Sequence, residues 1–176
     1  MHTPARLRAL ALTAALALLA PSASHAQDED AGKPQQFQDW TVRCGPVTTG
    51  DGKPVNRCVM NQVTGRDNKP MALVEFTHDP DKDRIIAQFT TPLGSVLPTG
   101  LRLKVDEGEE GRLPYQFCLP LGCRVVFPTK PEFIASMKKG NVLHMSFDLI
   151  NNQTANAQIS LQGFTSALKA ISKPFP

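Results

Sequence analysis

The feature that most constrains this chain is a two-residue hydrophobic period that recurs along it. Leu143, Met145 and Phe147 alternate with polar neighbours, and five other short runs alternate in a similar way. Alternation of this kind is typical of a strand with one face in a core and the other in solvent. Because the runs are short and numerous, the sequence predicts an all-β sandwich or barrel. The expected strands include residues 40–44, 72–77, 85–89, 101–105, 143–149 and 157–162.

The segments between these runs contain turn formers and little helix. A hairpin is expected from residues 115–119 and 123–127, closed by Pro120-Leu121-Gly122, and turns are expected at 50–52, 65–68, 79–81, 98–100 and 151–152. Thr129 and Glu132 form a capping-box pattern, which predicts a short helix ending at Gly140. A second short helix is expected at 165–171, and the polar segment 27–36 predicts a frayed terminus.

The N-terminal segment has the order of a secretory signal peptide. Arg6 and Arg8 precede an apolar run at residues 9–20, and small residues follow as far as Ala26. Ser24 and Ala26 place the expected cleavage after Ala26. The apolar run is shorter than the roughly 20 residues that span a bilayer, so no stable membrane anchor is expected after cleavage. We therefore expect a single domain at residues 27–176, located in the periplasm or secreted from the cell.

Composition and charge exclude two classes of protein. The chain is 41% hydrophobic and 20% charged, which is too apolar for a disordered chain. Its formal charge is +3, and loss of Arg6 and Arg8 with the signal leaves +1. A nucleic-acid-binding protein needs a concentrated basic surface, so no nucleic-acid partner is expected.

All four cysteines, Cys44, Cys58, Cys118 and Cys123, follow the signal. An even number in an exported chain favours disulfide bonds. Three pairings are open. The local pairs Cys44–Cys58 and Cys118–Cys123 are favoured, although the crossed pairings would also close loops. In the chain-entropy model a loop of about 15 residues contributes about 3 kcal/mol, and one of about six contributes about 2 kcal/mol.

Metal and redox roles for these cysteines are disfavoured by their spacing. Structural zinc sites use closely spaced Cys-x2-4-Cys pairs, and the separation of Cys44 from Cys58 does not fit. A catalytic redox pair is typically Cys-x-x-Cys at a helix N-terminus, whereas Cys118 and Cys123 lie between strand-like runs. We therefore expect no metal ligand, no cofactor-binding residue and no cofactor.

Candidate catalytic groups are few. Of the histidines that follow the signal, His144 lies on the polar side of a strand and His78 has only Asp79 as an obvious neighbour. Residues 79–83 resemble the start of a calcium loop but lack its later glycine and glutamate. The acidic run 106–111 is expected to be a solvated loop or, less simply, a contact for a cation or basic partner. No catalytic motif is present, so no catalytic residue is expected and the chain is expected not to be an enzyme.

Several short stretches, in order, resemble the invasion-associated locus B family of exported bacterial proteins. The resemblance implies an immunoglobulin-like β-sandwich with one or two short helices, export, a role in entry into host cells, no catalytic residue, and structural bridges at the cysteines. The matching stretches are Phe37-Gln-Asp-Trp40-Thr-Val-Arg-Cys44, Cys58-Val-Met-Asn-Gln62, Pro92-Leu-Gly-Ser-Val-Leu-Pro-Thr-Gly100 with Leu101-Arg-Leu-Lys-Val-Asp106, Pro114-Tyr-Gln-Phe-Cys118-Leu-Pro-Leu-Gly-Cys123, Lys139-Gly140, and Ser160-Leu-Gln-Gly-Phe164 with Ala167-Leu168.

Three functions are therefore compared. The first is an exported non-enzymatic protein that binds a protein partner, on a host surface or in the envelope, through loops such as 50–54, 65–69 and 106–111. The second is a periplasmic structural or assembly factor, chaperone-like in envelope maintenance. The third is a hydrolase or isomerase with a dispersed site, for which a deep pocket with two titratable groups would be evidence.

Overall fold

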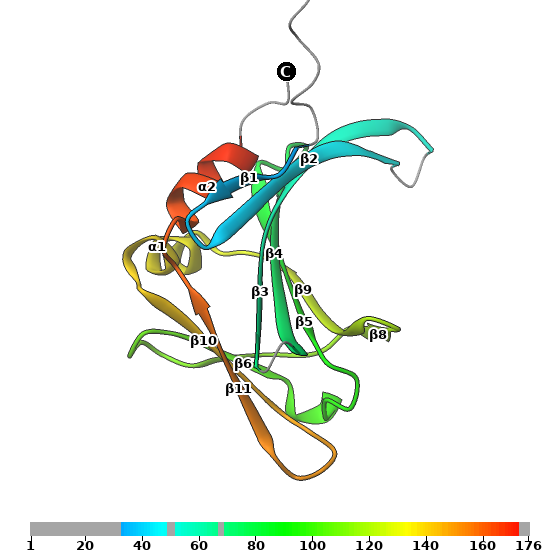
Figure 1. The fold of residues 1–176 in the computed structure, drawn as a ribbon, viewed down its shortest axis with the longest axis vertical. Coiled ribbons are helices and arrows are strands. Elements are labelled where there is room, and N and C mark those ends of the chain that lie inside the picture. Colours follow the sequence, from blue (N-terminus) through cyan, green and yellow to red (C-terminus); the bar gives the residue numbers. More distant parts are fainter. Residues whose placement is uncertain (1–32, 49–51, 67–68, 173–176) are drawn as a thin grey trace, which may run out of the picture.

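The protein is described here from a computed structural model, which describes residues 33–48, 52–66 and 69–172. Within these residues strands dominate, with two short α-helices and one 3-10 turn (Figure 1). The elements in chain order are β1 (Gln35–Phe37), β2 (Trp40–Thr48), β3 (Pro54–Arg66), β4 (Lys69–Asp79), β5 (Arg84–Thr91), η1 (Leu97–Thr99), β6 (Leu101–Val105), β7 (Gly111–Leu113), β8 (Phe117–Leu119), β9 (Gly122–Pro128), α1 (Pro131–Lys139), β10 (Val142–Asp148), β11 (Thr154–Ser160) and α2 (Phe164–Ile171).

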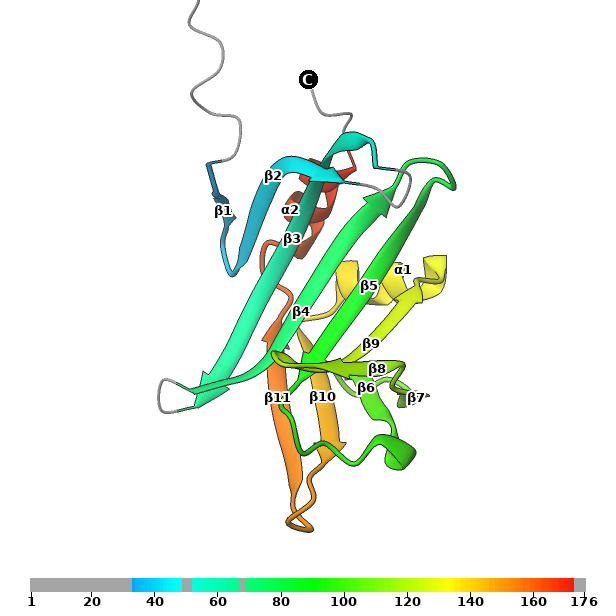
Figure 2. The ribbon, with the colours of Figure 1, turned by 90° about the vertical axis from the view of Figure 1, so that its right-hand side faces the viewer.

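The described strands form two antiparallel sheets. The large sheet has the order β1-β2-β3-β4-β5-β9-β8, and the small sheet has the order β11-β10-β6-β7. Figure 2 shows the outer face of the large sheet, with the small sheet behind its lower part and the two helices behind its upper part. The predicted fold class, an all-β sandwich with one or two short helices, is confirmed.

The core lies between the sheets and beneath α2. Val74 and Phe76 of β4 and Ala87 and Phe89 of β5 face inward, as their alternation predicted, and meet the buried side of β10. At the upper end α2 takes the place of the small sheet, and Phe164 packs edge-on against Phe76 with ring centroids 5.4 Å apart. Burial of such large apolar side chains is the main favourable term in folding.

A polar clamp joins the two sheets beside this core. The buried Trp40 indole donates its Nε1–H to the Ser160 carbonyl oxygen at 3.0 Å. Gln62 of β3 donates to the same oxygen at 3.1 Å, and its own Oε1 accepts the Ser160 N–H at 2.8 Å. The end of β11 is therefore held to β2 and β3 by bonds that satisfy groups which would otherwise be costly to bury.

Two disulfide bonds link Cys44 to Cys58 and Cys118 to Cys123. Each is a local pair between residues that are directly opposite on neighbouring antiparallel strands, in β2–β3 and β8–β9. The bonds therefore close the two hairpins that project from the large sheet (Figure 1).

Two strands of the large sheet were not expected. The longest, β3, lacks a clear hydrophobic period because the polar Gln62 faces inward to the clamp while Val59 and Val63 face outward. The strand β1 lies partly in the segment predicted to be frayed. It pairs with β2 after a turn at Gln38, whose φ is 54°, and its three residues are too few to show a period.

The predicted capping box at Thr129 is wrong, although the helix is present. The N-cap of α1 is Lys130, without a side-chain cap bond, and the Thr129 hydroxyl donates to the Ile85 carbonyl oxygen at 3.0 Å instead. A tertiary bond to β5 has displaced the local one. The predicted second helix is α2, which begins one residue early at Phe164.

Several predictions lie outside the described residues. They are the signal peptide with its cleavage after Ala26, the start of the turn at 50–52, and the centre of the turn at 65–68.

Gly163 provides a test of the junction between β11 and α2. Its φ is +84°, and a Cβ atom there would lie 2.0 Å from the Phe37 carbonyl oxygen. We expect Gly163→Ala to lower the free energy of unfolding by about 2 kcal/mol or more, through backbone strain and displacement of β1. Urea denaturation measures this. The matched control is Gly45→Ala, because a Cβ at Gly45 meets nothing within 4 Å; equal effects of the two substitutions would contradict the expectation.

The two disulfides should contribute unequally because they close loops of different length. The residue separation is 14 for Cys44–Cys58 and 5 for Cys118–Cys123. Replacing both cysteines of a pair by alanine should cost about 3 kcal/mol for the first pair and about 2 kcal/mol for the second. Urea denaturation of each double variant, compared with the oxidised parent, checks this. If either variant has an unchanged free energy of unfolding, that disulfide does not stabilise the fold.

Candidate functional site

A cleft of about 770 Å³ opens between α1, the end of β9 and the β6–β7 hairpin. Figure 1 shows α1 and this hairpin on the same side of the molecule. Apolar side chains line the cleft, among them Leu103 and Leu113 from the hairpin strands and Phe127 and Phe133 from the helix side. Phe127 and Phe133 lie with ring centroids 6.1 Å apart. The volume is within the range of roughly 300–1,000 Å³ that is usual for ligand sites.

Charged side chains of both signs surround this apolar lining. Within the described part of the chain none of them forms an ion pair with another protein group, so their charges are available to a ligand. They are Glu109, Glu110, Arg112, Lys130, Glu132 and Lys139.

Asp106 is the one acid of the cleft that is engaged internally. Its carboxylate accepts the backbone N–H of Val142 at 2.9 Å and that of Asn141 at 3.1 Å. These bonds, first the one from Val142, hold the pKa of the Asp106 carboxyl below its usual value. The acidic run 106–111 is thus a solvated loop whose first residue fastens it to the start of β10.

The cleft is better suited to binding than to proton transfer. A general acid or base works best with a pKa near the working pH, and the pKa of Asp106 is moved away from neutrality. No histidine or cysteine lines the cleft. Among the described residues no group of three or more histidine, cysteine or acidic side chains is placed to hold a metal ion. The arrangement can bind an apolar group and orient charges around it.

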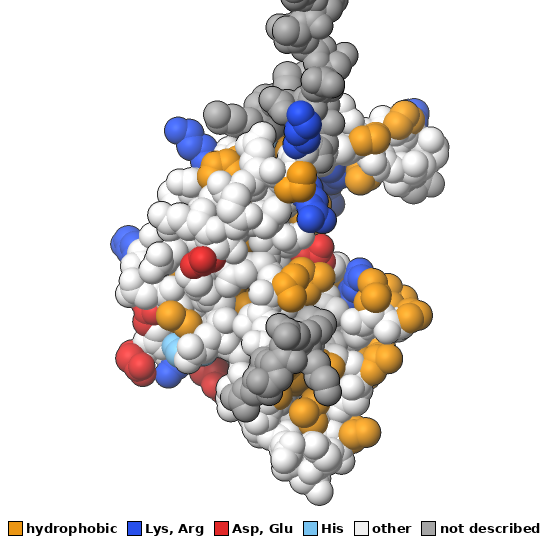
Figure 3. Space-filling view, viewed as in Figure 1, with side chains coloured by type: hydrophobic (Ala, Val, Ile, Leu, Met, Phe, Trp, Pro, Cys, Tyr) orange, Lys and Arg blue, Asp and Glu red, His pale blue; other side chains and the backbone are white. Residues whose placement is uncertain are grey.

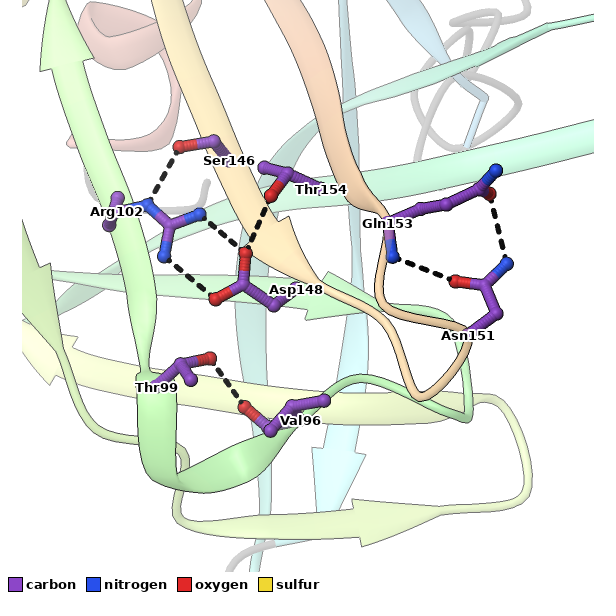
Figure 4. Close-up of polar contacts among 8 residues, drawn as sticks. All are labelled: Val96, Thr99, Arg102, Ser146, Asp148, Asn151, Gln153 and Thr154. Carbon is purple, nitrogen blue, oxygen red and sulfur yellow. Dashed lines mark hydrogen bonds and ion pairs between the residues drawn. The ribbon is translucent and has the colours of Figure 1, made fainter.

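A second polar cluster lies on the outer face of the small sheet (Figure 4). Arg102 of β6 donates to both carboxylate oxygens of Asp148, at 2.9 and 3.2 Å, and its Nε–H reaches the Ser146 hydroxyl at 3.2 Å. Thr154 of β11 also donates to Asp148, at 2.8 Å. The Arg102 guanidinium, followed by the Thr154 hydroxyl, holds the pKa of the Asp148 carboxyl well below its usual range. Every acceptor oxygen of Asp148 is thus occupied, so the cluster joins three strands rather than offering a free site.

Three hydroxyl groups meet beside the end of β5. The Thr91 hydroxyl lies 2.8 Å from that of Ser95 and donates to the Tyr115 hydroxyl at 3.0 Å, while Ser95 donates to the Pro92 carbonyl oxygen at 2.8 Å. Burial raises the pKa of the Tyr115 hydroxyl. No histidine or carboxylate hydrogen-bonds to these groups, so no general base activates a nucleophile here. Their role is to fasten the 91–95 loop and the segment before β8 together.

The structure separates the candidate residues that the sequence suggested. His78 contacts Asp83 at 3.1 Å rather than its neighbour Asp79, whose carboxylate pairs with Arg84 at 3.1 Å. Asp79 was the only obvious neighbour of His78 in the sequence, but the antiparallel turn brings Asp83 back toward β4 and into contact with His78. His144 lies on the small sheet opposite Lys104 and has no catalytic partner. These groups do not converge on one site.

The sequence analysis identified only one of the segments that line the cleft. The loop 106–111 was a candidate surface, but the contributions of Phe127 and α1 were not foreseen. Their only local signal was the apolar face of the predicted helix. An apolar helix face indicates that the helix packs against another part of the protein, but it does not indicate which hairpin lies opposite.

The Asp148 cluster predicts a defined acid response. Because the folded-state pKa is depressed below the ordinary value of 3.8, the unfolded chain binds the proton more tightly, and the stabilisation present at neutral pH is lost as the pH falls below about 4. Asp148→Asn should be less stable at neutral pH and should lose less stability between about pH 4 and about pH 2.

Urea denaturation across this range measures both effects. Asp81→Asn, which removes the same charge from an exposed turn, is the control and should follow the parent. An Asp148→Asn profile identical to the parent at every pH would contradict the prediction.

Comparison with known proteins identifies relatives of this chain. Residues 40–172 match the family model described as invasion associated locus B (IalB) protein. An invasion protein B homologue of Brucella abortus is 27% identical over 139 residues, covering 78% of each chain. Invasion protein B of Bartonella bacilliformis is 25% identical over 137 residues, covering 75% of this chain and 70% of that protein.

The fold is also similar to a solved structure. The crystal structure of invasion associated protein B from Bartonella henselae matches with a TM-score of 0.68 and 23% identity, covering 79% of this chain and 94% of that one. None of the described helices is long and apolar enough to cross a membrane. The family model spans both sheets and α2, so the resemblance extends over the whole described domain from Trp40 onward. The chain therefore belongs to the invasion associated locus B family.

Proposed function

We propose that this chain is an exported, non-enzymatic binding protein that contributes to host-cell interaction by holding a partner segment in the cleft between α1 and the β6–β7 hairpin. Family membership supports the invasion-associated role, and the N-terminal segment supports export. The observation that carries the binding role is the cleft itself, whose apolar lining is surrounded by charges that form no ion pair with another described residue.

The shape and charge of the cleft favour a protein segment as the partner. An apolar side chain can fill the space near Phe127 and Phe133, and removal of its surface from water supplies affinity. Charges flanking that side chain would meet Lys130 and Glu132 on one side and Glu109 on the other. Rim charges of both signs mainly set orientation and specificity. The absence of catalysis is part of the proposal and rests on the lack of a suitably placed acid or base.

Site-specific photo-crosslinking in intact cells tests the proposal. A photoreactive amino acid at Ser136, which lines the cleft, should trap a partner protein, and one at Asn156, exposed on the small sheet, should not. In the Ser136 background, Lys130→Glu should lower the yield of the adduct several-fold by reversing a charge at the edge of the cleft.

Fractionation of the same cells distinguishes the roles. Adducts with a host surface protein, together with the chain at the cell surface or in the medium, support host-cell interaction. Adducts confined to periplasmic proteins, with an envelope defect on deletion, favour the structural or assembly role. If positions 136 and 156 give the same adducts, or neither gives any, the cleft is not the binding site.

A further inference from the structure

The exposed large hydrophobic side chains are concentrated at one end of the molecule, away from the cleft. Of the eight among the described residues, six come from three segments: the β5–β6 loop, the β8–β9 hairpin and the β10–β11 turn. Figure 3 shows hydrophobic side chains gathered on the β8–β9 hairpin and below it. We call this surface the apolar end; its residues are Leu93, Leu97, Phe117, Leu119, Leu121 and Ile150.

The three segments are held together in a fixed arrangement. The Ile150 N–H donates to the Gly94 carbonyl oxygen at 2.9 Å, and the Val96 N–H donates to the Asp148 carbonyl oxygen at 2.8 Å. The β8–β9 hairpin is closed by the Cys118–Cys123 bond and packs closely against the end of β5, where a Cβ at Gly122 would lie 2.3 Å from the Thr91 carbonyl oxygen. The apolar side chains are therefore presented on a preformed surface, which lowers the entropy cost of binding.

Two of these side chains project from turns. Leu121 at the tip of the β8–β9 hairpin is 82% exposed, and Ile150 in the β10–β11 turn is 78% exposed. A contiguous exposed apolar surface on a folded protein indicates an interaction with another protein or with a membrane. The two can be distinguished by the size and the charge of the surface.

The segments that supply the residues of the apolar end contain long stretches without a charged residue. Residues 85–101, 113–123 and 149–168 contain no lysine, arginine, aspartate or glutamate. A protein–protein interface usually includes a polar, charged rim and about 20–30 residues a side. Six exposed apolar side chains on two loops and a hairpin, in stretches of sequence without charged residues, fit instead the apolar boundary of a bilayer, where a charged side chain is costly.

The charges that border the apolar end are mainly arginines. Arg124 lies directly opposite Phe117 across the β8–β9 pair; its half-buried side chain forms no ion pair with a described residue, and its buried Nε has no hydrogen-bond partner. Arg112, which also lines the cleft, packs beside Gly100 at the end of η1. The nearby acid Asp148 is neutralised by Arg102. Guanidinium groups that no acid of the described protein pairs with, placed behind an apolar tip, complement the phosphates of anionic headgroups.

We propose that the apolar end is a membrane-docking surface, which inserts Leu121 and Ile150 into the interface of a phospholipid bilayer that carries anionic headgroups. The attachment is reversible and peripheral, because a few side chains enter the bilayer rather than a spanning segment. None of the six residues of the apolar end lines the cleft between α1 and the β6–β7 hairpin, and the proposal does not depend on the function proposed for that cleft.

Vesicle sedimentation with the disulfide-bonded chain tests this proposal. We expect binding to vesicles of phosphatidylcholine with about 30% phosphatidylglycerol and weaker binding to phosphatidylcholine alone. Leu121→Asp and Ile150→Asp should each lower the affinity about tenfold or more. Val47→Asp makes the same change at the exposed tip of the β2–β3 arm, at the other end of the molecule (Figure 1), and should bind like the parent. Each variant is checked for parental stability by urea denaturation.

A fluorescence measurement tests insertion directly. The only tryptophan, Trp40, is fully buried and supplies a constant background. In Leu121→Trp, the added emission should shift to the blue on anionic vesicles and should be quenched by brominated lipid.

The proposal is overturned if the parent does not bind anionic vesicles, or if Val47→Asp reduces binding as much as Leu121→Asp. It is also overturned by salt-sensitive binding without a blue shift, which would mean adsorption through arginines alone. Loss of a dimer in Leu121→Asp without vesicle binding would instead make the apolar end an interface between copies of the chain.

Discussion

The structure depends on the contact between Trp40 and the end of β11. The indole ring lies in an aromatic cluster, 5.7 Å from Phe76 and 5.4 Å from Phe164 between ring centroids, while its N–H is bonded to the Ser160 carbonyl oxygen. Gln62 binds both backbone groups of the same residue. This one position therefore joins the large sheet, the small sheet and α2, and it sets how the sheets stack. The cleft and the apolar end both follow from that stacking.

The two surfaces differ in how many charges they carry, and they have separate structural supports. The cleft combines an apolar lining with unpaired charges and lies beside α1, where Asp106 secures the acidic loop to β10. The apolar end has arginines only at its border and is secured by the Thr91–Ser95 hydroxyl contact and by the Cys118–Cys123 bond. Neither support is shared with the other surface. A chain of this design could bind lipid at one end while the cleft stays open to a protein.

Strands with one polar and one apolar face were predicted correctly because their signal is local. In β10 every second residue is buried, and the prediction needed nothing beyond that run. The prediction failed for β3, where Gln62 is directed inward by a partner 98 residues away. It failed in a different way for Thr129. Its expected capping partner is close in the sequence, but its hydroxyl donates instead to the Ile85 carbonyl oxygen, 44 residues away.

The sequence by itself determined the strand-rich class, the two short helices and the acidic loop, because hydrophobic periodicity and charge act over a few neighbouring residues. It favoured the local cysteine pairs without excluding the crossed ones. Only the tertiary structure decided which hairpin faces α1 across the cleft, and that Leu121, Leu93 and Ile150 share one surface. Which residues share a surface depends on the order and stacking of the strands. These arise from contacts between segments far apart in the chain, and no hydrophobic period within one segment reveals them.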